Sequence, residues 1–335
     1  SFLAYDGGEE TERMLDGRLV KSINTNLTAG LDLTRARRLR ENLGIAFMGD
    51  TKGGAFDIPG EMARNMLASA NPDGRQNSDV VRPWINGLDV TRRPRGMWII
   101  DFGTDVPIEE AALYEAPFEY VKQHVEPVRK ASRTTTAAWW LHERPRPEMR
   151  TALGKLERFI ATPTTAKHRL FVWVGRETLP HNALIAFARD DDYFFGVLQS
   201  SVHELWALCL GTQLETRPRY TPTTTFETFP FPECNDEAKE QIAKAARSLD
   251  ERRNGWLNPP GLTEAELPRR TLTNLYNQRP EWLAQAHERL DRMVYAAYGW
   301  DYPLEPEEVL ARLAELNLGR AAKGSSGSDE EGGSA

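Results

Sequence analysis

Apolar positions recur every three to four residues in three segments after Pro232, namely 234–257, 280–300 and 305–320. This spacing places them on one face of an α-helix, and each segment is bounded by Pro, Gly or Asn, which begin or end helices. The pattern therefore predicts a small helical domain over about 233–320. Its expected core residues are Leu249, Leu257, Leu283, Leu290, Met293, Leu310 and Leu313.

The chain before Pro232 has shorter segments of alternating type. Helices are predicted over 33–44, 59–69, 109–130 and 200–210. The first begins at Asp32 and Thr34, which can cap a helix. β-Branched and aromatic residues predict strands over 158–174 and 183–198, and two paired extended segments around the turn-prone Asn86–Gly87. The chain is therefore expected to be an α+β protein, in which a mixed α/β domain precedes the small helical domain.

The segment 214–232, LETRPRYTPTTTFETFPFP, fits neither pattern. Its prolines lack the backbone donor that helices and central strands require, so it can be neither of these. It also brings together charged residues, a run of threonines and three phenylalanines.

Charge suggests a partner for the first part of the chain. The formal net charge of −7 is concentrated after Pro232, where 13 Lys and Arg stand against 19 Asp and Glu, whereas residues 1–232 carry 29 against 30. Residues 129–169 hold ten basic residues and three acidic ones, with Trp and His between them. Such a block suits the neutralisation of nucleic-acid phosphates. It is equally typical of a solvated helical face with aromatic core residues behind it.

Motifs for catalysis are weak. The string NPPG at 258–261 is close to the Asn-Pro-Pro-aromatic motif of amino-group DNA methyltransferases, but Gly261 has no ring to stack on a base. We interpret it as a turn that ends a helix. The glycine-rich 49–54 lacks phosphate-loop spacing, and Asp190–Asp192 has no second acidic cluster for a divalent ion, so we expect a turn between strands.

Compartment and chain ends follow from simpler features. No apolar run approaches the roughly 20 residues of a membrane helix, and no signal-peptide pattern is found, so the expected location is the cytoplasm. Cys209 and Cys234 lack the paired spacing of a zinc site. Residues 1–30 look like strands and turns cut from a longer chain, and the polar, glycine-rich 321–335 are expected to be a disordered tail.

Seven strings are together similar to one family: INTNLTAGLDLTRARRLREN, IAFMGDTKGGAFDI, NSDVVRPWINGLDVTRRPRGMWIIDFG, RPRPEMR, IATPTTAKHR, ARDDDYFFGVLQSSVHELWAL and RYTPTTTFETFPFP. They resemble the C-terminal part of MmeI-like (type IIG/IIL) restriction–modification proteins. Those single chains join a nuclease, an adenine-N6 DNA methyltransferase and a target recognition domain. The resemblance implies that 1–30 end the methyltransferase-type domain, 31–232 form the DNA target recognition domain, and 233–320 form the helical C-terminal domain.

The resemblance also implies a function. The chain would be a sequence-specific DNA recognition module that positions catalytic domains lying outside this segment, with double-stranded DNA and a methyltransferase domain or subunit as partners. The family's nuclease motif, cofactor loop and Asn-Pro-Pro-aromatic motif lie upstream and have no counterpart here. The methyl donor S-adenosylmethionine therefore belongs to the parent enzyme, a site-specific adenine DNA methyltransferase.

Base-reading residues of the family fall just before the TPTT string, which implies that Gln213, Glu215, Arg217 and Arg219 are the readers. In an extended loop Glu215 and Arg217 point the same way, so the carboxylate can accept from cytosine N4 while the guanidinium donates to guanine. A surface salt bridge is the alternative. Phe226, Phe229 and Phe231 are expected to anchor this segment against the domain core.

Contacts to the DNA backbone are expected from cations and hydroxyl groups, which fix the register without reading sequence. The candidates are Arg82, Arg92, Arg93, Arg95, Arg144, Arg146, Arg150, Lys167, Arg169, Thr223 and Thr224.

Two other hypotheses remain open at this point. The chain could be a specificity subunit that docks on a separate methyltransferase and binds DNA only in the complex, which the acidity of the helical domain favours. It could also be an enzyme in its own right, for which Asn258 and Asp190–Asp192 are the only candidate residues.

Overall fold

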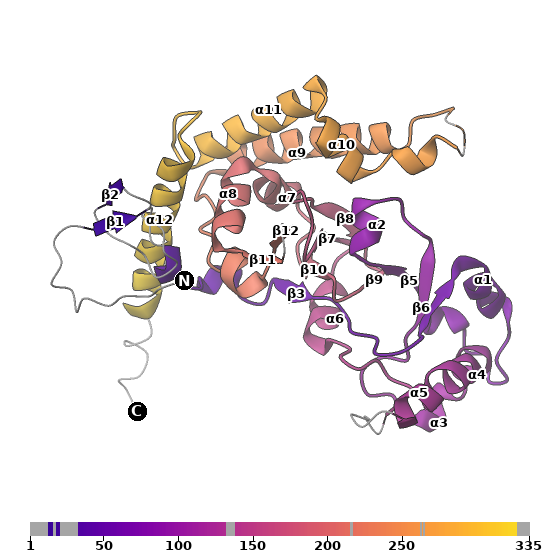
Figure 1. Cartoon of the computed structure of the whole chain (residues 1–335). Helices are drawn as coiled ribbons and strands as arrows, with labels where there is room; N and C mark the ends of the chain where they lie inside the picture. The colour runs from indigo at the N-terminus through magenta and orange to yellow at the C-terminus, as the bar shows by residue number, and fades with distance from the viewer. Residues whose placement is uncertain are drawn as a thin grey trace, which may run out of the picture.

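The structure is a computed structural model that describes residues 13–15, 18–20, 33–131, 138–214, 217–261, 263 and 265–326. Two four-stranded sheets lie in the middle of the chain, and long C-terminal helices cover one of them (Figure 1). Two separate two-stranded hairpins are formed by β1 (Arg13–Leu15) with β2 (Arg18–Val20) and by β11 (Thr212–Leu214) with β12 (Arg217–Arg219). This architecture confirms the predicted α+β class.

The first sheet has the order β3 (Ala46–Met48), β10 (Leu184–Phe187), β7 (Arg158–Pro163) and β8 (Val172–Gly175), with antiparallel neighbours throughout. The strands predicted over 158–174 are confirmed. The strand predicted over 183–198 is correct only for its first part, because Asp192–Gln199 forms helix α7. The Asp191 carboxylate accepts from the Phe194 N–H at 2.8 Å and starts that helix, whose apolar residues are buried on every side.

The second sheet has the order β4 (Asp57–Pro59), β6 (Met97–Ile100), β5 (Val81–Ile85) and β9 (Leu179–Pro180), and β9 joins β5 in parallel. The predicted pairing of two extended segments is confirmed in β5 and β6. Their connection is not a simple turn, because the Asn86 side chain accepts from the backbone of Leu88 and Asp89, and Asp89 accepts from the Asn86 N–H. This capping box begins the short helix α2 (Gly87–Thr91).

Two helix predictions need correction. Residues 33–44 form only the 3₁₀ turns η1 (Leu33–Arg35) and η2 (Arg40–Asn42), because distant groups take their backbone donors: the Leu39 N–H donates to Glu227 O at 2.7 Å and the Arg37 N–H to Asn317 Oδ1 at 2.8 Å. The helix predicted over 109–130 is three helices, α3 (Ile108–Ala111), α4 (Glu115–His124) and α5 (Glu126–Ala131). Prolines in the first turn of α4 and of α5 cannot continue the preceding helix.

Five further helices confirm the sequence pattern: α1 (Gly60–Ala68), α8 (Ser201–Leu210), α9 (Asp236–Leu257), α11 (Glu281–Ala297) and α12 (Pro306–Ser326). Two short helices, α6 (Pro147–Leu153) and α10 (Leu272–Gln278), were not predicted. Leu249, Leu283, Leu290 and Leu313 are buried as predicted, and the remaining three core candidates are half-buried.

Two apolar clusters form the core. One lies around the second sheet and α1 and α4, and includes Phe56, Ile99 and Val121. The other joins one face of the first sheet to the C-terminal helices, with Phe187 and Trp206 in the same cluster as Leu290. The core therefore continues across Pro232, and the domain boundary expected there stays a prediction.

Candidate nucleic-acid interface

The β11–β12 hairpin is joined to the loop between β7 and β8. Thr165 and Arg219 pair as an antiparallel bridge, and the Tyr220 N–H donates to Thr164 O at 2.7 Å. Gly211 ends α8 against the same hairpin, where a Cβ would lie 2.8 Å from Arg219 O. Arg219 is exposed. For the other predicted readers, Gln213 and Arg217 lie in the two strands but their side chains are outside the described part, as is the whole of Glu215.

A groove of about 470 Å³ lies between the start of α2 and the β7–β8 loop. Arg92 and Lys167, both predicted to contact DNA, line it and are exposed. Thr164 and Thr165 line it as well, so the groove and the hairpin share the β7–β8 loop. Helix α10 supports this arrangement, because the Lys167 ammonium donates to Asn277 Oδ1 at 2.6 Å.

Some residues of the groove gave no signal in the sequence. Leu88 follows the Asn86 cap, lines the groove and is 49% exposed. His181 is neutral at physiological pH, since burial and the nearby Lys52 lower its pKa. Its Nδ1 accepts from the Ala183 N–H at 3.0 Å, which leaves Nε2 as the ring's donor. Neither the exposure of Leu88 nor the neutral form of His181 could be predicted from the sequence, because both depend on tertiary contacts.

A second groove, of about 400 Å³, lies beside β3 and is lined by Arg144 and Arg146. The Arg144 side chain is 65% exposed and lies 3.9 Å from Glu143. Arg146 donates from Nε to Gly49 O at 3.4 Å and stays half-buried. Thr223 and Thr224 are exposed in η4 (Pro222–Phe226), and the Thr224 hydroxyl donates to Thr221 O at 3.5 Å.

Each of the other predicted cations already binds two or more oxygen acceptors within the chain. Arg82 donates to the carbonyls of Glu177 and Arg176, at 3.1 and 3.2 Å. Arg93 donates to Leu257 O and Asn258 Oδ1, at 3.1 and 2.8 Å.

Arg95 makes a bidentate contact with Asp89, at 2.9 and 3.2 Å, which lowers the pKa of that carboxylate although burial acts against it. These contacts leave fewer donors on Arg82, Arg93 and Arg95 for a phosphate.

Arg150 belongs to a buried ionic network between the two sheets. It pairs with Asp50, which follows β3, and with Asp101 at 2.6 Å, which follows β6. Burial alone would raise the pKa of Asp101, but Arg150, His142 and Arg82 outweigh it and lower the pKa to about 2. His142 completes the network, with Nδ1 3.1 Å from Asp50 and Nε2 2.9 Å from Ile100 O. A phosphate contact by Arg150 would therefore require both ion pairs to break.

The glycine-rich turn at 49–54 is filled by the protein itself. A Cβ at Gly53 would lie 2.6 Å from the Glu143 Cβ and 2.9 Å from Arg129 Nη2, and a Cβ at Gly49 would overlap the His181 carbonyl. These close approaches explain the glycines as packing positions. They do not fit a loop that holds a nucleotide or S-adenosylmethionine.

The two weak catalytic strings have structural roles. Asn258 ends α9 and Gly261 has a φ of +83°, which confirms the predicted helix-ending turn. The acidic run does not lie between two strands as predicted, since it starts α7. Asp192 pairs with Arg158 at 2.8 Å and with Arg247 at 3.1 Å. Among the described residues, no cluster of three or more His, Cys, Asp or Glu could hold a metal ion.

The phenylalanines of the 214–232 segment anchor it, as predicted. Phe226 and Phe229 are fully buried, and Phe231 stacks on Phe194 with ring centroids 4.6 Å apart. These buried rings fix the chain after the hairpin, and Gly211 at the end of α8 fixes the chain before it.

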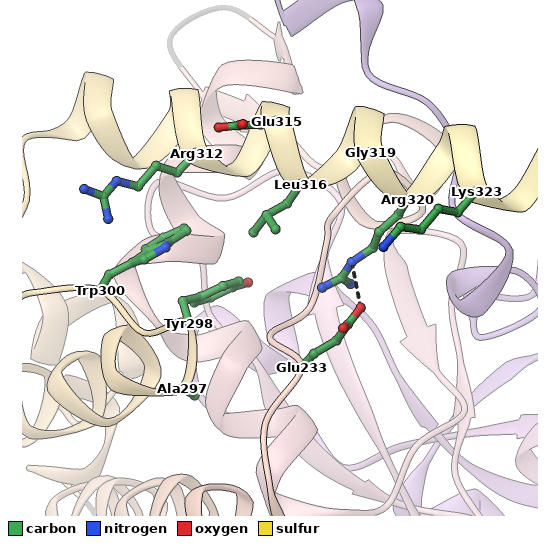
Figure 2. A pocket seen from close by; sticks show the side chains of 10 residues that line it. All are labelled: Glu233, Ala297, Tyr298, Trp300, Arg312, Glu315, Leu316, Gly319, Arg320 and Lys323. Atoms are coloured by element: carbon green, nitrogen blue, oxygen red, sulfur yellow. Dashed lines mark ion pairs between the residues drawn. The ribbon is translucent and has the colours of Figure 1, made fainter.

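Figure 2 shows a third groove, of about 530 Å³, between α12 and the end of α11. Tyr298 and Trp300 stack in it with centroids 4.3 Å apart. Its rim carries both signs of charge, and Arg320 there pairs with Glu233 at 3.2 Å. This mixture of charges does not favour a polyanion, so we leave the groove outside the DNA interface.

No helix within the described residues is long and apolar enough to cross a membrane.

An α+β fold in which a groove with exposed cations shares a loop with a hairpin suits nucleic-acid recognition, and comparison with known proteins identifies the family. Residues 63–233, just over half of the chain, match the family model described as "MmeI, target recognition domain". The chain therefore belongs to the MmeI target recognition domain family.

Two relatives are consistent with this assignment. The chain is 30% identical over 144 residues to "DNA methyltransferase A" of Bacillus subtilis (strain 168), a match that covers 42% of this chain and 15% of the relative. It shares its fold with the solved "Type IIL restriction-modification enzyme MmeI in complex with DNA", with a TM-score of 0.70 and 20% identity over 91% of this chain. It spans 39% of the length of that protein.

Proposed function

We propose that this chain recognises a short DNA sequence for a larger adenine-N6 DNA methyltransferase. The observation that carries the proposal is the junction between the β11–β12 hairpin and the groove at α2, through the bridge between Thr165 and Arg219. A reading element and a phosphate-binding element that share one loop keep a fixed distance, which a register on DNA requires.

In this proposal Gln213, Glu215, Arg217 and Arg219 read base edges in the major groove, where each base pair presents a distinct set of donors and acceptors. Arg92, Lys167, Arg144 and Arg146, with the hydroxyl groups of Thr223 and Thr224, contact the backbone. Their exposure supports this assignment, except for the half-buried Arg146. Arg82, Arg93, Arg95, Arg150 and Arg169 are not included, because each of their guanidinium groups already binds two or more oxygen acceptors within the chain.

The complete enzyme would supply catalysis. The relatives' names support a DNA methyltransferase, and S-adenosylmethionine would supply the methyl group in a domain outside this segment. Residues 1–30 would end that domain, 31–232 would recognise the target, and 233–320 would form the helical domain. A cytoplasmic location follows from this role, since the DNA of the cell is the substrate.

The test is DNA binding by the chain at increasing salt concentration. If about five phosphates are neutralised, log K should fall with log salt with a slope of about −4 to −5. The combined variant with Arg92→Met, Arg144→Met and Arg146→Met should reduce this slope by about 0.9 for each phosphate that is no longer neutralised, and should weaken binding to all sequences alike. A matched control is Arg176→Met, an exposed arginine outside both grooves, 3.0 Å from Glu157. An affinity independent of salt would refute a phosphate surface.

A second candidate is a specificity subunit that binds DNA only with a separate methyltransferase. The mixed charges and stacked aromatic rings of the groove at α12 favour it, because such a surface suits protein side chains. Specific DNA binding by the isolated chain would argue against this candidate. Binding that occurs only after a methyltransferase is added would favour it.

A further inference from the structure

Lys167 and Arg169 are two residues apart in the β7–β8 loop. The sequence predicts a phosphate contact for both, but their environments in the structure differ. Lys167 is exposed at the groove, whereas Arg169 is only 9% exposed. Burial lowers the pKa of Arg169 to about 10, so it still carries its charge at neutral pH. A buried cation costs free energy, and its contacts should explain why it is there.

The Arg169 guanidinium joins two segments of the backbone. Nη1 donates to Thr162 Oγ1 at 3.0 Å and to Pro163 O at 2.5 Å, both at the end of β7. Nη2 donates to Pro218 O at 3.3 Å, in the middle of β12. Pro163 and Pro218 have no N–H and cannot donate a backbone hydrogen bond to a neighbouring strand. Strand pairing therefore holds these two positions with fewer hydrogen bonds.

Two buried aromatic side chains, Tyr220 and His203, pack beside the Arg169 guanidinium. The Arg169 guanidinium lies 5.0 Å from the Tyr220 ring centroid, and the Tyr220 hydroxyl lies 3.0 Å from His203 Nε2. Burial lowers the pKa of His203 to about 3, so the ring is neutral. Its Nδ1 lies 3.0 Å from Leu198 O, which accepts only, so Nδ1 carries the proton and Nε2 accepts from Tyr220. Each donor in this chain of hydrogen bonds has a fixed direction.

We infer that Arg169 is a positioning residue, which holds strand β12 in register so that Arg219 faces the bases. The inference rests on the proposed function, and it assigns Arg169 a role different from phosphate contact. Lysine should replace it poorly, because one ammonium nitrogen would have to make the hydrogen bonds that Nη1 and Nη2 of the planar guanidinium make from separate positions.

The first test is amide hydrogen exchange across Thr212–Tyr220, without DNA, in the intact chain. Arg169→Met should accelerate exchange in this hairpin by about tenfold or more, while β10 keeps its wild-type protection. Arg169→Lys should do the same, and it serves as the second variant if the methionine variant does not fold. Lys167→Met is the matched control and should leave exchange unchanged. Wild-type exchange in a folded Arg169 variant would overturn the inference.

The second test uses DNA and separates positioning from phosphate contact. Lys167→Met should reduce the salt slope by about 0.9, whereas Arg169→Met should leave the slope unchanged and broaden the sequence preference among bound duplexes. A slope reduced by about 0.9 in Arg169→Met, with an unchanged sequence preference, would also overturn the inference. If the wild-type chain binds no DNA, the proposed function fails, and the exchange experiment still decides whether Arg169 holds the hairpin.

Discussion

Glu215 and Arg217 are the residues for which the reading hypothesis makes its sharpest prediction. If they read one C·G pair, Glu215→Lys with Arg217→Asp presents donors where acceptors stood and should favour the reversed G·C pair. Each contact contributes roughly 1–3 kcal/mol of discrimination. Either change alone should mostly abolish activity, because one buried group is left without a partner. Only the double variant should restore it.

The measurement is mapping of modified sites in DNA from cells that express the full-length enzyme. One base of the site should change in the double variant and the others should not. The matched control reverses an exposed pair elsewhere, Glu157→Lys with Arg176→Asp, and should leave the site unchanged. An unaltered site with normal activity in the Glu215 and Arg217 variant would mean that these two residues form a structural salt bridge.

Asp291 on α11 predicts a pH dependence of stability. Burial raises its pKa to about 6, although the Ser201 N–H donates to the carboxylate at 2.8 Å. Because the folded chain then binds a proton that the unfolded chain releases, the stabilising contribution is complete below about pH 4 and is lost as the pH rises to about 6. The loss is at most about 3 kcal/mol.

Asp291→Asn keeps the acceptor for Ser201 and removes the titration. It should raise the urea midpoint at pH 8 and should flatten the change in stability between pH 4 and pH 6. Glu288→Gln, at an exposed position of the same helix, is the control and should keep the wild-type profile in this window. Parallel profiles for wild type and Asp291→Asn would show that the carboxylate is ionised in the folded chain.

The sequence could locate the basic strings of the interface but not the direction of each side chain. In TRRPR, Arg92 is exposed at the groove, while Arg93 reaches the end of α9 and Arg95 returns to Asp89. Those acceptors lie up to 165 residues away in the sequence. A basic string predicts charge, whereas tertiary contacts decide which charges remain available.

At the scale of elements, the junction of α8 and β12 should be sensitive to a single methyl group. A Cβ at Gly211 would lie 2.6 Å from Ala207 O and 2.8 Å from Arg219 O, and both are backbone atoms that cannot rotate away. Gly211→Ala should therefore displace the hairpin and cost about 1–3 kcal/mol, measured by urea unfolding.

The control for this prediction is a glycine with open space around it. Gly319 lies in the interior of α12, and a Cβ there would have no described atom from outside its own helix backbone within 4 Å. Gly319→Ala should therefore stabilise the chain by about 0.5–1 kcal/mol. Equal effects of the two substitutions would show that the α8–β12 junction can relax.

Long elements were predictable because their apolar spacing extends over several turns, as in α9 and α11. Several short elements were not predictable. Residues 33–44 have helical spacing, but Asn42 uses its side chain to donate to Phe229 O at 2.7 Å and Leu39 its backbone to bind Glu227. Conversely, the apolar residues 193–198 favour a strand by composition, and the cap at Asp191 makes them a helix. A helix cap and a distant acceptor each outweigh local preference in such short segments.

At the scale of the whole molecule, the net charge differs between the two parts of the sequence while the core is shared. The acidic excess belongs to the residues after Pro232, and the two cation-lined grooves are formed largely by residues before it. This division should let the first part face DNA without repulsion from the second. The core nevertheless continues through both, since Gly196 on α7 approaches α9 so closely that a Cβ would lie 2.7 Å from Ile242 Cγ2.

A chain ended after Pro232 should therefore not fold, even though the matched family model ends close to that residue. The truncation would uncover α7, where the fully buried Phe195 ring lies 5.7 Å from the Arg253 guanidinium of α9 and Gly196 packs against Ile242. Each large apolar side chain returned to water costs roughly 1.5–3 kcal/mol, and several together exceed the total of about 5–15 kcal/mol that stabilises a domain. The expected result is a single cooperative unfolding transition for the intact chain and aggregation or an unfolded spectrum for residues 1–232. A chain ended after Ser326 is the control and should unfold like the intact chain; a cooperative transition in the shorter fragment would instead establish the boundary at 232 as a true domain border.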